Sequence, residues 1–96
     1  MNLDIIDIIS NLSIELQIKT FLVGGYVRDL ILSRQSKDID VLVIGDGISF
    51  AKEVKKKLDT MVNLQIFKNF GTAMIIYDGF EIEFVGSAFF PMEQNQ

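Results

Sequence analysis

Residues 20–44 read TFLVGGYVRDLILSRQSKDIDVLVI, and this stretch decides the fold. It contains a short apolar run, a glycine pair, a helix-like segment, a polar loop and a second apolar run that opens with two aspartates. Residues 20–23 and 38–44 have the aliphatic and β-branched content of buried strands, and residues 26–32 predict a helix between them. The stretch therefore predicts a strand, a glycine turn, a helix and a central strand of an α/β domain.

The segments on either side of this stretch predict two further helices and three further strands. The helices are expected over 3–17 and 48–58, because apolar residues recur there on one face: Ile5, Ile9, Leu12 and Leu16 in the first, and Phe50, Ala51, Val54 and Leu58 in the second. The strands are expected over 64–67, 72–77 and 80–85, and the last two are joined by the hairpin signal Asp78-Gly79. The pattern predicts an α+β domain with a small mixed sheet of about five strands backed by helices.

The composition restricts the chemistry that the chain can carry out. The chain has 96 residues, enough for one domain, and it contains no cysteine and no histidine. Disulfides, thiolate ligands and imidazole ligands are therefore excluded. Any metal ion must be held by oxygen atoms, which favours Mg²⁺ or Mn²⁺. The net charge is −4, whereas a nucleic-acid binder is usually basic, so composition by itself does not predict RNA binding.

The sequence carries no sign of a membrane segment. No apolar run approaches the length of about 20 residues that spans a bilayer. The N-terminus opens with Asn2 and Asp4, and it lacks the basic and then apolar order of a secretory signal. We therefore expect a cytoplasmic protein with no membrane partner.

Two aspartates open the predicted central strand. Asp38 and Asp40 are separated by one residue, so in a strand both side chains point to the same face, with Cα atoms about 6.5 to 7 Å apart. Two carboxylates about 6 Å apart repel by about 3 kcal/mol at an effective dielectric constant of about 20, and a bound cation would offset this repulsion. Ile39 faces the other side and would anchor the strand in the core. The alternative is a strand start whose acids face solvent or pair with Lys37 and Arg34.

A glycine pair follows the first predicted strand. Gly24 and Gly25 stand between a strand and a helix, where small residues allow backbone N–H groups and the positive end of the helix to approach a phosphate. Arg28 lies in the first turn of that helix and would add a charge-assisted contact to the same phosphates. The alternative is a tight turn with an ordinary surface arginine. The glycine pair and the aspartate pair together indicate a nucleotide site more specifically than either does alone, because they would place the phosphates beside the metal ion.

Several of these strings resemble one enzyme family. Residues 23–32 (VGGYVRDLIL) and 37–40 (KDID) look like the head domain of the class II tRNA nucleotidyltransferases and the related bacterial poly(A) polymerases. Residues 67–73 (FKNFGTA) and 81–86 (EIEFVG) are similar to later strands of that domain, so the resemblance covers nearly residues 20 to 86. It implies a polymerase-beta-like nucleotidyltransferase fold.

The resemblance also implies an activity and a set of site residues. The activity is transfer of CMP or AMP from CTP or ATP to a tRNA 3′ end, with two Mg²⁺ ions, or Mn²⁺, at the reacting groups. Asp38 and Asp40 would be the catalytic metal ligands, and Glu83 would be the additional catalytic carboxylate. Glu81, two residues earlier on the same face, is the fallback. The residues expected to bind the triphosphate are Gly24, Gly25 and Arg28.

The match departs from the family pattern near its end. The family continues with an Ala-Arg-x-Glu-like segment, whereas residues 87–90 read SAFF and lack the arginine expected near position 88. We expect a head domain over 1–86 and a divergent, frayed tail over 87–96. The neck, body and tail domains by which the family selects nucleotides and holds tRNA do not fit into 96 residues. We therefore expect a fragment or a truncated product with little or no activity alone.

The aromatic residues allow further expectations. Four phenylalanines in or beside apolar strands are assigned to packing: Phe67, Phe70, Phe80 and Phe84. Phe89 and Phe90 follow the last strand with no further element to cover them, so they predict a self-association surface or the contact with a neck domain. A second hypothesis for the function is a non-catalytic domain that keeps the fold and binds nucleotides or a protein partner.

Overall fold

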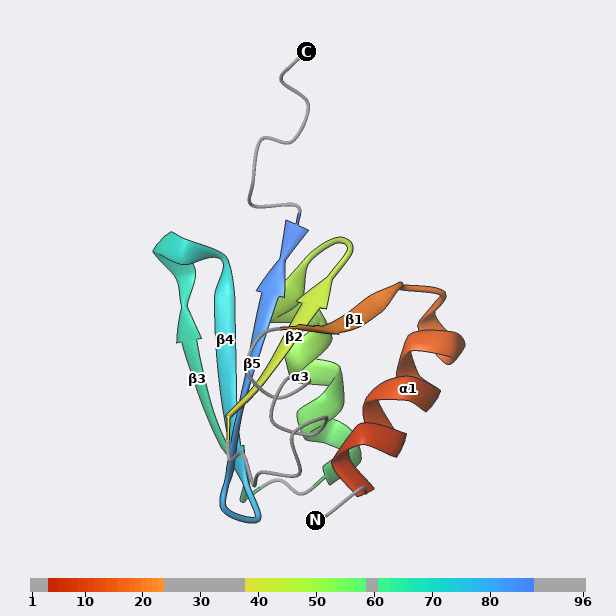
Figure 1. Cartoon of the computed structure of the whole chain (residues 1–96). Helices are drawn as coiled ribbons and strands as arrows, with labels where there is room; N and C mark the ends of the chain where they lie inside the picture. Colours follow the sequence, from red (N-terminus) through yellow and green to blue (C-terminus); the bar gives the residue numbers. More distant parts are fainter. Residues whose placement is uncertain (1–3, 24–37, 59–60, 88–96) are drawn as a thin grey trace.

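The protein is represented by a computed structural model that describes residues 4–23, 38–58 and 61–87 (Figure 1). The described elements are, in chain order, α1 (Asp4–Leu16), β1 (Thr20–Val23), β2 (Asp38–Val43), α3 (Gly47–Leu58), β3 (Asn63–Phe67), the 3₁₀ turn η1 (Lys68–Phe70), β4 (Thr72–Tyr77) and β5 (Phe80–Gly86). Each falls where the sequence predicts an element, apart from η1, which was not expected. The helix expected over 26–32 lies outside the described residues.

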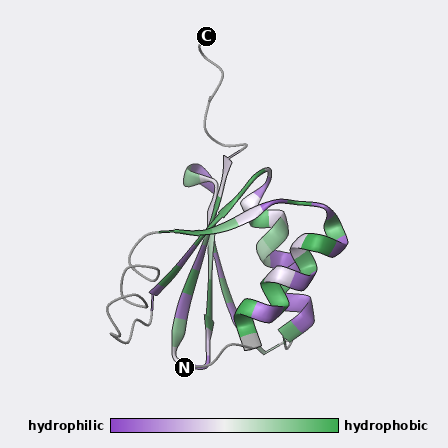
Figure 2. Ribbon diagram, turned by 45° about the vertical axis from the view of Figure 1, so that its right-hand side comes forward, coloured by the Kyte–Doolittle hydropathy of each residue, from purple (hydrophilic) through white to green (hydrophobic). Residues whose placement is uncertain are grey.

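The five strands form one mixed sheet in the order β1-β2-β5-β4-β3 (Figure 1). The central strands β2 and β5 run parallel, and the other three neighbouring pairs are antiparallel. Both described helices lie on one side of this sheet (Figure 2). The expected small mixed sheet backed by helices is therefore confirmed. One face of the sheet is covered by α1 and α3, and we call the opposite face, which neither of the two described helices covers, the open face.

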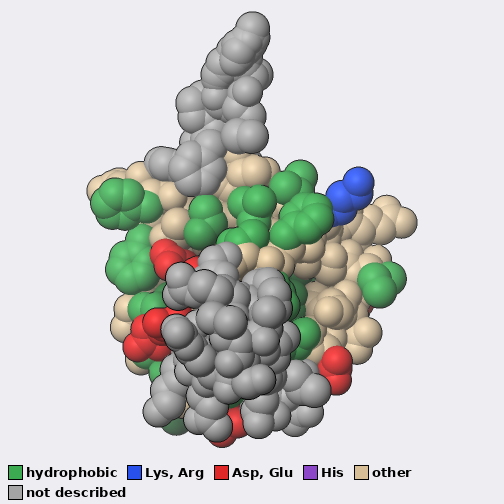
Figure 3. Space-filling model, in the orientation of Figure 1, with side chains coloured by type: hydrophobic (Ala, Val, Ile, Leu, Met, Phe, Trp, Pro, Cys, Tyr) green, Lys and Arg blue, Asp and Glu red, His purple; other side chains and the backbone are tan. Residues whose placement is uncertain are grey.

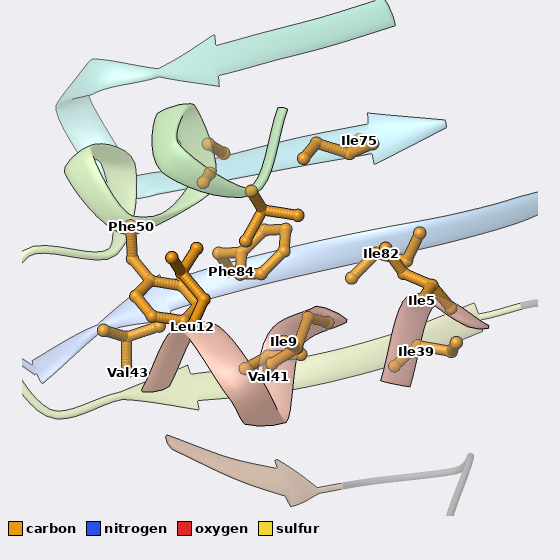
Figure 4. Close-up of a cluster of buried hydrophobic side chains, with 13 residues drawn as sticks. Ile5, Ile9, Leu12, Ile39, Val41, Val43, Phe50, Ile75, Ile82 and Phe84 are labelled. Carbon is orange, nitrogen blue, oxygen red and sulfur yellow. The ribbon is translucent and has the colours of Figure 1, made fainter. Parts of the chain in front are cut away.

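The core lies between the sheet and the helices (Figure 4). It is built from aliphatic residues of α1, the inward positions of β2, β4 and β5, and one face of α3: Ile5, Ile9, Leu12, Ile39, Val41, Val43, Phe50, Ala51, Val54, Ala73, Ile75, Ile82 and Phe84. At its centre the rings of Phe50 and Phe84 lie 6.0 Å apart at an angle of 50°. Alternate residues of β2 enter this core, because successive side chains of a strand point to opposite faces. Ile39 therefore anchors the strand as expected.

The start of α3 is fixed by two local features. The carboxylate of Asp46 accepts hydrogen bonds from the backbone N–H groups of Ile48 and Ser49, at 3.0 and 3.1 Å, and so caps the helix. These bonds, with one from the Ser49 hydroxyl, lower the pKa of Asp46. Gly47 meets the end of β5 backbone to backbone, since a Cβ on Gly47 would come within 2.6 Å of the Gly86 nitrogen. The cap and this contact fix how α3 lies on the sheet.

The hairpin between β4 and β5 follows the predicted turn chemistry. Asp78 and Gly79 have φ angles of 52° and 81°, as both central residues of a type I′ turn require. The Asp78-Gly79 prediction is therefore confirmed. Among the described helices, neither is long and apolar enough to cross a membrane.

Part of the predicted packing is wrong. Phe84 is buried and the half-buried Phe80 packs against the core, but Phe67 is 38% exposed and Phe70 is 67% exposed. Phe67 ends the edge strand β3 on the open face, and Phe70 lies in η1, so neither side chain is placed in the core. Leu16 is also 36% exposed at the last turn of α1. The apolar pattern of these segments does not show which face of the sheet the two described helices cover.

Candidate functional site

The register of the two central strands places four acidic residues in a block on the open face. Asp40 lies opposite Glu83, and Asp38 lies opposite Glu81, in the parallel pair β2 and β5. All four share one face, because the residues between them are buried beneath the helices. Asp40 and Glu83 are half-buried, whereas Asp38 and Glu81 are exposed. The sequence predicts that Asp38 and Asp40 share a face. The pairing of β2 with β5 places Glu81 and Glu83 on that same face.

Apolar side chains flank the half-buried pair of acids. Val23 of β1 lies opposite Asp40, and Met74 of β4 lies opposite Glu83, so the pair is bordered on each side along the row. The next row across the open face is mostly apolar and runs through all five strands: Phe21, Leu42, Val85, Thr72 and Phe67. Figure 3 looks onto this face and shows hydrophobic side chains gathered above acidic ones. Apolar neighbours reduce the local dielectric constant, which strengthens the attraction of the acids for a cation.

The carboxylates suit a metal ion that also binds a substrate. Among the described residues, no three acidic groups gather closely enough to hold an ion by themselves. Mg²⁺ is commonly held by one or two carboxylates, with waters and substrate phosphates completing its coordination. Asp38 and Asp40, on alternate positions of one rigid central strand, match that donor set. Asp38 and Asp40 could therefore supply the protein ligands of such an ion, and this role stays a prediction.

A hollow at the opposite end of β2 holds none of the predicted site residues. It has a volume of about 230 Å³ and is lined by Gly45, Asp46, Gly47, Ile48, Lys68, Gly71 and Gly86. β2 runs about 17 Å from Asp38 to Val43 before the chain reaches it. The hydroxyl of Ser87 accepts a hydrogen bond of 3.0 Å from the Gly45 N–H beside this hollow. The sequence analysis did not predict this hydrogen bond, because it joins residues that are 42 positions apart in the chain.

Several predicted residues lie outside the described part of the chain. They are the triphosphate-binding candidates Gly24, Gly25 and Arg28, the tail residues Phe89 and Phe90, and position 88, where the family pattern has an arginine. Val23, which directly precedes the glycine pair, is described and lies opposite Asp40. β1 therefore ends beside Asp40, one residue before the glycine pair begins.

The sequence of this chain is similar to those of known proteins. Residues 20–93 match the family model described as the poly A polymerase head domain. Over 70 residues the chain is 43% identical to the A-adding tRNA nucleotidyltransferase of Geobacter sulfurreducens (strain ATCC 51573 / DSM 12127 / PCA), an alignment that covers 72% of this chain. The chain spans only 8% of the length of that relative.

Solved structures show the same arrangement of elements. A complex of a CCA-adding enzyme with ATP superposes with a TM-score of 0.81 and 27% identity, over 91% of this chain and 21% of that protein. A tRNA nucleotidyltransferase complexed with a primer tRNA and an incoming ATP analogue gives a TM-score of 0.73 and 32% identity, over 81% and 22% of the two chains. The chain therefore spans less than a quarter of each structure.

Proposed function

This chain belongs to the poly A polymerase head-domain family, and we propose that its open sheet face binds a divalent cation together with ATP or CTP for nucleotidyl transfer to a tRNA 3′ end. The observation that carries the proposal is the register that sets Asp40 beside Glu83, with Asp38 next on the same face. The relatives support the substrates, because solved structures similar to this chain contain ATP, or a primer tRNA with an ATP analogue.

The positions of the residues on the sheet suggest a role for each. Asp38 and Asp40 hold the cation, and β2 keeps the spacing of their carboxylates fixed because Ile39 between them is buried. When bound, Mg²⁺ would neutralise charge on the triphosphate and make the attacking 3′-hydroxyl easier to deprotonate. Val23 and Met74 border the pair of Asp40 and Glu83, one on each side along the row.

The triphosphate is assigned to the segment after β1. Gly24, Gly25 and Arg28 supply backbone N–H groups and a guanidinium in this proposal. Support comes from Val23, since it lies opposite Asp40 and is joined covalently to Gly24. Phosphates bound by this segment would then lie close to the cation that Asp38 and Asp40 hold.

Glu83 is the better candidate for the additional carboxylate. It lies opposite Asp40 and is half-buried, whereas Glu81 lies opposite Asp38 and is exposed. A half-buried carboxylate has lost more hydration than an exposed one, so it gains more from a shared cation. We expect Glu83→Gln to weaken Mg²⁺-dependent nucleotide binding at least several-fold, and the matched change Glu81→Gln to weaken it less. The reverse order would assign the role to Glu81.

The main experiment is calorimetric titration of the 96-residue chain with ATP and with CTP, with Mg²⁺ present and after chelation by EDTA. We expect binding that requires Mg²⁺ and that weakens about tenfold or more in Asp38→Asn and in Asp40→Asn, a loss of about 1.4 kcal/mol or more. Asp7→Asn is the control, because it removes the same charge from an exposed position on α1. Circular dichroism verifies that each variant folds.

Two results would count against this function. Nucleotide binding that is unchanged in both aspartate variants, or that persists without Mg²⁺, would place the nucleotide elsewhere. A folded chain with no affinity for either nucleotide would favour the non-catalytic alternative, in which the domain keeps the fold as a protein-interaction module.

A further inference from the structure

The edge strand β3 exposes backbone groups that can pair with another strand. β3 is the last strand on its side of the sheet, and no described element lies beyond it (Figure 1). An edge strand leaves a row of N–H and C=O groups unpaired along its outer side. Its five residues pair with β4 in one continuous antiparallel register from Asn63 to Phe67, with no bulge to turn the edge away.

The side chains of this edge lack the features that normally prevent pairing. Residues 61–67 read MVNLQIF and contain no charge, no proline and no glycine, although the whole chain has a net charge of −4. Proteins usually protect an exposed edge with charged residues, proline or a bulge. Within β3 only Leu64 is half-buried, while Ile66 is 42% exposed and Phe67 is 38% exposed. The edge is therefore both uncharged and partly apolar.

We propose that β3 pairs antiparallel with β3 of a second copy of this chain, about a two-fold axis at Gln65. In this register Leu64 lies opposite Ile66 of the second copy, on the covered side of the sheet. Asn63 lies opposite Phe67 on the open side, and the two Gln65 side chains face each other about 5 Å apart. The two sheets then join into one.

The composition of the edge favours a second copy as the occupant. In a two-fold contact the residue on the axis meets its own copy, and a charge elsewhere in a short strand is brought close to the same charge of the other copy. Residues 61–67 contain none, and Lys68 would lie opposite Val62 of the second copy. The partly exposed Ile66 would meet Leu64, so apolar residues match on the covered side, while Phe67 meets Asn63 on the open side. A pair of five-residue strands is a small contact, and we expect a dimer that depends on concentration.

The proposed dimer does not depend on the proposed function. β4 and β5 follow β3 in the sheet order, so the acidic pair Asp40 and Glu83 lies on strands removed from the joined edge. Nucleotide binding is therefore expected to be the same in monomer and dimer. Failure of one proposal leaves the other standing.

The test uses charge at the two-fold axis. Gln65 is exposed, so Gln65→Lys and Gln65→Glu are compatible with folding, and each sets two like charges face to face in the dimer. Sedimentation over low to high micromolar concentration should show self-association of the unchanged chain. Each variant alone should associate at least about fivefold more weakly. An equal mixture of the two variants should recover association, because opposite charges then meet.

Ser10→Lys supplies the matched control, since Ser10 is exposed on α1, away from the edge. It should associate like the unchanged chain. A chain that stays monomeric throughout the concentration range would overturn the proposal. So would a dimer that survives both Gln65 variants, or variants that lose association and do not regain it when mixed. Circular dichroism on each variant ensures that loss of association is not loss of folding.

Discussion

The two faces of the sheet differ although the same strands build both. On β2, Ile39 and Val41 are at most 1% exposed beneath the helices, while Asp38 and Asp40 alternate with them on the open face. The covered face gains stability from apolar burial, whereas the open face sets acids beside one another at a cost in stability. Removing a buried apolar side chain from the covered face should therefore lower stability, whereas removing an acid from the open face should raise it.

The largest effect is expected from the centre of the covered face. Phe84→Ala removes a fully buried ring that lies 6.0 Å from Phe50, and should lower the free energy of unfolding by about 3 to 5 kcal/mol. Urea denaturation followed by circular dichroism measures this loss. Phe70→Ala is the matched control at 67% exposure and should cost less than about 1 kcal/mol. Equal losses would mean that burial beneath the helices does not set the cost of removing a ring.

A smaller effect is expected where α3 begins to cover the sheet. Asp46→Ala removes the helix cap and should cost about 1 kcal/mol at neutral pH. Because hydrogen bonding lowers the pKa of Asp46 in the folded chain, its stabilisation is complete above the unfolded pKa of about 3.9 and is lost as the pH falls through the folded value. Denaturation at pH 7 and below pH 4 should show the difference from the unchanged chain shrinking.

Asp46→Asn is the control for that measurement, since asparagine also caps helices but has no carboxyl to titrate. It should retain most of the stability at neutral pH. A difference between Asp46→Ala and the unchanged chain that grows in acid would contradict the role given to the carboxylate.

The smallest effect, and the one of opposite sign, is expected on the open face. Without metal, Asp40→Asn relieves repulsion from Glu83 and Asp38. Solvent screens this repulsion because Asp38 is exposed and the other two acids are only half-buried, so the free energy of unfolding should rise by about 0.5 kcal/mol. Adding Mg²⁺ with nucleotide should stabilise the unchanged chain and not the variant, which thermal melts would detect. A clear loss of stability in metal-free Asp40→Asn would show that this acid has a structural role instead.

Much of the covered face could be predicted from the sequence because its signals are local. Helical spacing placed Ile5 and Ile9 in the core, and strand alternation put Asp38 and Asp40 on one face opposite Ile39. The Asp78-Gly79 turn was predictable because its two positive φ angles depend on those residues alone. These features can be predicted without knowing which other parts of the chain pack against them.

The rest depends on contacts between distant parts of the chain. That Glu83 lies opposite Asp40 follows from the parallel pairing of β2 with β5, and only the family resemblance pointed to Glu83 beforehand. The exposure of Phe67 depends on which side the helices cover, which an apolar pattern does not reveal. The phosphate-binding role of Gly24, Gly25 and Arg28 stays a prediction.

The contact between Gly47 and Gly86 restricts how the chain can vary. Each position lacks room for a methyl group because the other's backbone occupies that space. Enlarging one cannot be compensated by shrinking the other, since glycine is already the smallest residue. A combinatorial library randomised at both positions and selected for folding should therefore retain glycine at both. The two positions, 39 residues apart in sequence (86 − 47), would be restricted together.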